Sequence, residues 1–117
     1  MRPNGIHHVS INVDDVPAAI AFYTDVLGFV TRSDRPDFGF EGAWLDVGSQ
    51  QVHLLKAAVP SPNGQHYAIW VDDIETTVKE VRDKGVDVSD PMRVGRGLQA
   101  FLSDPAGNSI ELHQTPA

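Results

Sequence analysis

The chain contains an internal repeat with a spacing of 58 residues. The segment "GIHHVSINVDD" at 5–15 returns as "GQHYAIWVDD" at 64–73, and "QVHLL" at 51–55 aligns with "SIELH" at 109–113. In both alignments the equivalent histidines, aspartates and strand residues lie 58 positions apart. A repeat of this length indicates two copies of one supersecondary unit, because neither copy alone could bury its apolar face.

The first copy has the pattern of a strand, a helix and three further strands. Residues 6–13 alternate between apolar and polar side chains, as a half-buried strand does. Apolar residues then recur at helical spacing from about Val16 to Leu27, after aspartates that can cap the helix and before Gly28, which can end it. The three strands that follow are expected at 29–34, 42–48 and 50–57.

The second copy repeats this order after a linker. Residues 59–65 are rich in Pro, Ser, Asn and Gly, a composition typical of a connection between modules. The expected elements are a strand at 66–71, a helix at 72–85, and strands near 86–90, 97–103 and 108–114. We therefore predict a single α+β domain over residues 1–117, with βαβββ modules at about 5–58 and 66–115.

Four potential metal ligands occupy equivalent positions in the two modules. Each module should form a curved sheet with its helix on the convex side, so strand alternation decides which side chains face the concave side. The residues selected in this way are His8, His53, His66 and Glu111. Imidazole and carboxylate groups suit a divalent ion such as Mn, Fe, Co, Ni or Zn, and the absence of cysteine excludes thiolate ligands. His7 falls on the opposite face by the same alternation and is expected to be a surface or packing residue.

Aromatic and basic residues are candidates for binding a substrate. Alternation turns three aromatic side chains toward the cavity: Trp44, Trp70 and Phe101. The loop "RPDFGFEG" adds Phe38 and Phe40 as a candidate lid. These rings would form an apolar wall around the metal, with ordinary core packing as the alternative. Arg93 and Arg96 in "MRVGRG" could hold an anionic group, with a solvated glycine loop as the alternative.

Composition excludes several classes of protein. The formal net charge is -7 and the nine basic residues are scattered, which argues against a nucleic-acid-binding surface. Nowhere do eighteen apolar residues occur together, and the N-terminus has no apolar run typical of a signal peptide. We therefore expect a cytoplasmic protein that binds neither nucleic acid nor membrane.

Three segments carry a resemblance to a known family: "HHVSINVDDVPAAIAFYTDVLGF" at 7–29, "HYAIWVDDIE" at 66–75 and "SDPAGNSIELHQ" at 103–114. They resemble the vicinal-oxygen-chelate superfamily, which includes glyoxalase I, extradiol dioxygenases and bleomycin-resistance proteins. The resemblance covers nearly the whole chain. It implies a cup-shaped mixed sheet with the helices outside and metal ligands in the first and last strands of each module. Carried over by motif, those ligands are the same four residues that strand alternation selects.

The resemblance also implies a range of functions. The leading one is a small metal-dependent enzyme with glyoxalase-like lyase or isomerase chemistry on a small molecule with vicinal oxygens, using Glu111 as the general base. It implies one divalent ion as cofactor and a homodimer as the assembly. One alternative is an extradiol-type dioxygenase, because His8, His66 and Glu111 match the two-histidine, one-carboxylate pattern of non-haem iron oxygenases. The other is a non-catalytic drug-binding protein of the bleomycin-resistance kind. Glyoxalase I has carboxylates at both last-strand positions, whereas this chain has His53 at one of them.

Overall fold

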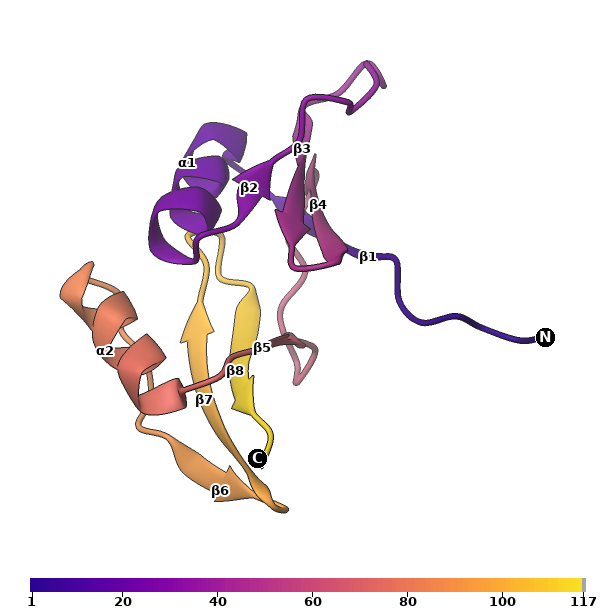
Figure 1. Cartoon of the computed structure of the whole chain (residues 1–117). Coiled ribbons are helices and arrows are strands. Elements are labelled where there is room, and N and C mark those ends of the chain that lie inside the picture. The colour runs from indigo at the N-terminus through magenta and orange to yellow at the C-terminus, as the bar shows by residue number, and fades with distance from the viewer. Residues whose placement is uncertain (117) are drawn as a thin grey trace. The chain divides into compact units, whose positions relative to one another are not determined.

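The computed structural model describes residues 1–116 and divides into two units, Met1–Pro60 and a second unit that begins at Ser61. Each unit is a four-stranded sheet with its helix packed on one face (Figure 1). The α+β class and the two repeated modules predicted from the sequence are therefore confirmed. Neither helical segment in residues 1–116 has the length and hydrophobicity needed to traverse a bilayer.

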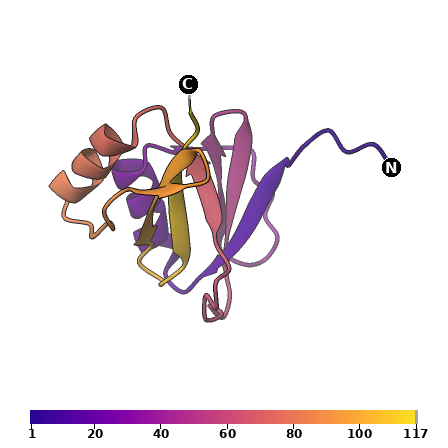
Figure 2. The same cartoon turned by 90° about the horizontal axis from the view of Figure 1, so that it is seen from below.

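The first unit follows the predicted order of elements. These are β1 (His8–Val13), α1 (Val16–Ala21) with a π-helical turn η1 (Phe22–Val26), β2 (Val30–Thr31), β3 (Gly42–Val47) and β4 (Gln50–Lys56). The sheet has the order β1-β4-β3-β2, with β1 parallel to β4 and the other pairs antiparallel. The segment before β1 extends away from its unit in both Figure 1 and Figure 2.

The first helix begins and ends as the sequence indicates. Asp15 caps it by accepting a hydrogen bond from the backbone N–H of Ala18 at 3.0 Å. Gly28 follows η1 with φ of +74°, a left-handed conformation that favours glycine. The predicted strand at 29–34 is shorter in the structure: β2 ends at Thr31, the backbone N–H of Arg32 makes one more bond to the carbonyl of Trp44 at 2.8 Å, and the Arg32 side chain then pairs with Asp34.

The second unit differs from the prediction at one strand. Its elements are β5 (Tyr67–Trp70), α2 (Ile74–Asp83), β6 (Met92–Val94), β7 (Gly97–Ser103) and β8 (Ser109–Gln114), in the sheet order β5-β8-β7-β6. The strand predicted near 86–90 was wrong, and β6 lies further along the chain. Ser89 explains the difference, since its Oγ accepts the backbone N–H of Phe101 at 2.8 Å in place of a backbone carbonyl.

Strand register shows how closely the two units correspond. Ser10 of β1 pairs with His53 of β4, and Ala68 of β5 pairs with Glu111 of β8. Both partners in the second pair lie 58 positions after those in the first (10 to 68, 53 to 111). The same face of each central strand therefore carries the residue proposed to ligate, while the opposite face packs into the core.

Candidate metal-binding residues and the pocket of the first unit

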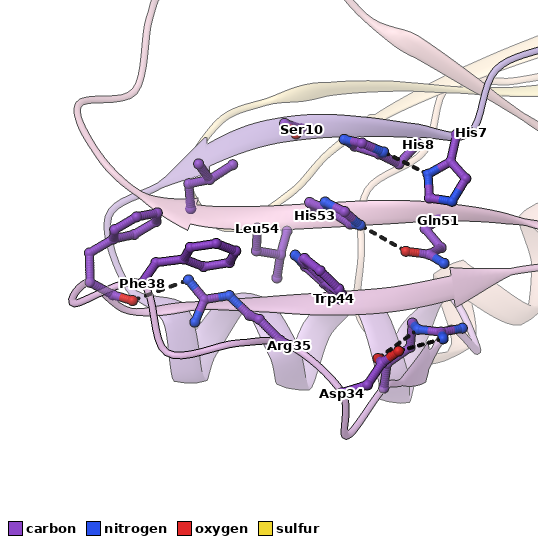
Figure 3. Close-up of a pocket in the computed structure, with 13 residues that line it drawn as sticks. His7, His8, Ser10, Asp34, Arg35, Phe38, Trp44, Gln51, His53 and Leu54 are labelled. Atoms are coloured by element: carbon purple, nitrogen blue, oxygen red, sulfur yellow. Dashed lines mark hydrogen bonds and ion pairs between the residues drawn. The ribbon is translucent and has the colours of Figure 1, made fainter.

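Two histidines lie against each other on the open face of the first sheet. His8 begins β1, and its β4 partner is Gln51, two residues before His53 on the same face. The His8 and His53 rings stack with centroids 3.9 Å apart and an angle of 14° between their planes. Trp44 of β3 pairs with His53 across the sheet and stacks on the His53 ring, with centroids 4.5 Å apart and an angle of 11° between the planes. The three rings form a column across three strands (Figure 3).

Hydrogen bonds and burial fix the state of His53. Its Nε2 lies 2.8 Å from Oε1 of Gln51, and because an amide oxygen only accepts, Nε2–H is the donor. The remaining nitrogen, Nδ1, then carries the lone pair. Burial lowers the pKa of His53, and the nearby charges of His8, His7 and two arginines lower it further. These effects favour the neutral form of the ring, which is the form that metal ions bind.

A histidine and a glutamate meet on the equivalent face of the second sheet. Nε2 of His66 lies 3.0 Å from Oε1 of Glu111, whose side chain is 11% exposed. Nδ1 of His66 donates to the carbonyl of Gly64 at 2.9 Å, and Nδ1 of His113 lies 2.7 Å from the other Glu111 oxygen. The Gly64 carbonyl, followed by Glu111, raises the pKa of His66 because both stabilise its protonated form.

The donors of the second unit fit a divalent metal ion. A metal-ligating histidine usually donates its other ring N–H to a carbonyl or carboxylate, as His66 does toward Gly64. That bond directs Nε2 toward the Glu111 carboxylate, so one nitrogen and one oxygen donor lie 3.0 Å apart. His8 and His53 also have nitrogen donors, and their rings stack on each other with centroids 3.9 Å apart. Within residues 1–116, no cluster of three or more His, Asp or Glu side chains has metal-binding geometry.

A pocket of about 530 Å³ opens beside the histidines of the first unit (Figure 3). Trp44, predicted to face a cavity, lines it, as do Phe38 and Phe40 of the predicted lid. Phe38 is 51% exposed and Phe40 is 45% exposed, so much of their apolar surface is available to a ligand. Their rings stack on each other at 5.7 Å.

Several pocket residues were missed by the sequence reading. His7 lines the pocket, and its Nδ1 lies 2.8 Å from Nδ1 of His8, whereas strand alternation placed it on the opposite face. That alternation does not apply because β1 begins at His8. Arg32, Asp34 and Arg35 also line the pocket. In the sequence, these three residues could have been recognised only from the several charged side chains that lie next to the loop with Phe38 and Phe40.

The remaining predicted substrate residues lie in the second unit. Phe101 makes an edge-to-face contact with His66, with centroids 5.3 Å apart. Trp70 is 76% exposed and donates its Nε1–H to Oγ1 of Thr115. Arg93 and Arg96 line a separate cavity of about 140 Å³. The structure therefore brings Phe101 to the His66–Glu111 pair and assigns the two arginines to a different hollow.

Comparison with known proteins identifies the family. Residues 5–112 match the model of the Glyoxalase/Bleomycin resistance protein/Dioxygenase superfamily. The chain belongs to this superfamily. The predicted resemblance to vicinal-oxygen-chelate proteins is thereby confirmed.

The proteins similar to this chain include proteins described as lactoylglutathione lyases and an antibiotic binding protein. A Synechocystis protein described as "Probable lactoylglutathione lyase" is 33% identical, with 92% of this chain and 93% of the relative aligned. The lactoylglutathione lyase of Haemophilus influenzae is 32% identical, with 91% and 89% aligned. Among solved structures, TnmS3, an antibiotic binding protein from Streptomyces sp. CB03234, superposes with a TM-score of 0.84 at 26% identity, with 99% of each chain covered.

Proposed function

We propose that this protein is a metal-dependent lyase or isomerase of glyoxalase type that acts on a small molecule with vicinal oxygens. The proposed ligands of the ion are His8, His53, His66 and Glu111. The observation that carries the proposal is the chain of contacts from Gly64 through His66 and Glu111 to His113, which holds one nitrogen and one oxygen donor 3.0 Å apart. The lactoylglutathione lyases among the relatives support the lyase assignment.

The proposed reaction moves a proton between neighbouring carbons. When bound, a divalent ion withdraws electron density from the substrate oxygens and so acidifies the adjacent C–H. Glu111 takes that proton on Oε1 and returns it to the next carbon, so the proton count is unchanged. His113 holds Oε2 and His66 contacts Oε1, so Glu111 would act as the base only after Oε1 moves away from the ion and from His66. An ion held by neutral imidazoles and the Glu111 carboxylate would keep a net positive charge, which would favour an anionic intermediate.

Elemental analysis tests this proposal. Protein purified without chelators and without a polyhistidine tag should carry about one equivalent of metal, as expected for a single resident ion. A His66→Ala, Glu111→Ala double variant should lose it. Glu75→Ala, which removes a carboxylate from α2, is the matched control and should retain the ion. Absence of metal after reconstitution with each of Mn, Fe, Co, Ni and Zn would sink the metalloenzyme proposal.

A second candidate function is a drug-binding protein without catalysis. The open aromatic pocket of the first unit favours it, because stacking on exposed rings needs no metal. TnmS3 shows that an antibiotic binding protein can share the fold.

Tightly bound iron, together with consumption of oxygen by the purified protein, would instead favour the extradiol-type dioxygenase. The expected homodimer stays a prediction, which sedimentation of the purified protein would test.

A further inference from the structure

The pocket of the first unit has walls made of aromatic rings. Trp44 and His53 stack on one side, and Phe38 lies 6.2 Å from Trp44 with an angle of 47° between the rings. Figure 3 shows these rings around one hollow, with Arg35 beside them. Aromatic pairs are favourable at centroid separations of about 4.5 to 7 Å, so a planar ring of a ligand could contact several of these side chains at once. The wall is therefore more suited to a flat ring than to an aliphatic chain.

The same pocket contains a cation without an acidic partner. Arg32 forms ion pairs with Asp34 at 2.8 Å and with Asp46 at 2.9 Å, which neutralise it. Arg35 is in no ion pair within the described residues, and its one hydrogen bond runs from Nη2 to the carbonyl of Phe40 at 3.1 Å. A guanidinium has five N–H donors, so Arg35 retains donors for a ligand.

The local structure holds the Arg35 guanidinium beside the aromatic rings. Its Cζ lies 5.1 Å from the ring centre of Phe38 and 5.3 Å from that of Phe40. A Cβ at Gly42 would lie 2.7 Å from Nη2 of Arg35 and would also collide with the carbonyl of Leu54. Glycine at this position therefore leaves the space that the guanidinium occupies.

We infer that this pocket binds a small anion that carries a planar aromatic ring, with the ring against Trp44 and Phe38 and the anionic group on Arg35. A guanidinium binds a carboxylate or similar planar anion through two parallel N–H bonds, which adds orientation to the charge attraction. That this ligand is the substrate rests on the proposed function. Its binding does not, since every residue involved lies in the first unit and none of the contacts requires a metal ion.

Three matched probes test the class of ligand by calorimetry on the unaltered protein in excess chelator. Benzoylformate has a ring and an anion, pyruvate has the same oxoacid group without the ring, and acetophenone has the ring without the charge. Benzoylformate should bind about tenfold or more tightly than either partial probe, because each lacks one of the two interactions. Equal binding of pyruvate, or of glutathione, would overturn the aromatic class, and equal binding of acetophenone would overturn the role of the charge.

Variants of two side chains locate the ligand. Arg35→Gln and Phe38→Leu should each weaken benzoylformate binding about tenfold, since one removes the cation and the other the ring. Arg2→Gln, a matched change outside the pocket, should leave the affinity unaltered. Phe38 is half exposed, so the Phe38→Leu variant should fold even if Arg35→Gln disturbs its loop.

Tryptophan fluorescence gives a second test. In a Trp70→Phe background, Trp44 is the only tryptophan, and benzoylformate should quench its fluorescence. Unchanged affinity in both variants would overturn the inference.

The two proposals fail independently in these experiments. A His66→Ala, Glu111→Ala variant should still bind benzoylformate without metal, because those residues belong to the second unit. Loss of metal binding in every preparation, with benzoylformate binding retained, would remove the proposed enzyme and leave the aromatic anion site. Metal binding without benzoylformate binding would remove the aromatic anion site and leave the proposed metal-dependent enzyme.

Discussion

Glu111 is a buried carboxylate that is shared by two imidazoles. Glu111 contacts His66 through one oxygen and His113 through the other, at 3.0 and 2.7 Å. A buried carboxylate costs free energy unless it is paired and hydrogen-bonded, so both contacts stabilise it where it lies. His113 thereby helps to fix the plane of the carboxylate, and in the proposed metal site it would leave Oε1 as the oxygen nearer the ion.

Removing His113 should weaken metal binding without removing a ligand. His113→Leu should lower the affinity for the ion about 10-fold to 100-fold, because the hydrogen-bond partners of ligands orient them. His113→Asn keeps an N–H donor close to the position of Nδ1 and should restore much of the loss. Competition with a chromophoric chelator measures the affinity, and the absorption of the cobalt-loaded protein reports the ligand geometry. Equal affinity in the leucine variant would contradict a positioning role.

Strand alternation predicted that His8, His53, His66 and Glu111 face the concave sides of the sheets, but it missed much of the pocket. Within each unit the structure brings two of these residues into contact, His8 with His53 and His66 with Glu111. Alternation depends only on the pleat of a strand, so it is reliable inside β4 and β8. Alternation cannot predict the orientation of His7, which precedes β1, because it applies only within a strand. It cannot predict that of Arg35 either, because this residue lies in a loop whose path is set by long-range contacts. The role of the four residues as ligands stays a prediction.

At the scale of elements, each helix begins at the second of two adjacent aspartates. Asp73 accepts a hydrogen bond from the N–H of Thr76 at 3.1 Å, as Asp15 does from Ala18 in the first unit. Both caps satisfy a backbone donor that the first helical turn would otherwise leave unpaired. Helix ends were predictable because caps and glycine stops are local signals. The strand at 86–90 was not, because Ser89 bonds with Phe101, far along the chain.

The cap on α2 should have a measurable effect on stability. Asp73→Ala should lower the free energy of unfolding by about 1 kcal/mol, because the N–H of Thr76 loses its acceptor. Asp73→Ser should recover most of it through the serine hydroxyl. Asp72→Ala, one residue earlier and exposed, is the control and should change little. Urea denaturation followed by circular dichroism gives all three values, and an equal loss in both alanine variants would exclude capping as the cause.

At the scale of the whole molecule, equivalent core positions should have similar energetic weight. Leu54 in β4 and Leu112 in β8 are each 1% exposed and lie 58 positions apart (54 to 112). Truncating either to alanine should cost about 3 kcal/mol, because each change removes buried apolar contacts and leaves a cavity. Urea unfolding of Leu54→Ala and Leu112→Ala tests this expectation. A cost below about 1 kcal/mol at one site only, far under the range for buried leucines, would show that the two cores are not equivalent.

The common register of the two sheets gives each half of the chain a built-in counterpart. Position 53 in one half and position 111 in the other occupy the same place in the same fold, yet one is an imidazole and the other a carboxylate. A substitution at either position would therefore change the charge on that face of its sheet while the surrounding strand pairing stays the same. The repeat thus separates the chemistry of the side chains from the architecture that presents them, so that one half of the chain can change its chemistry while the other keeps its own.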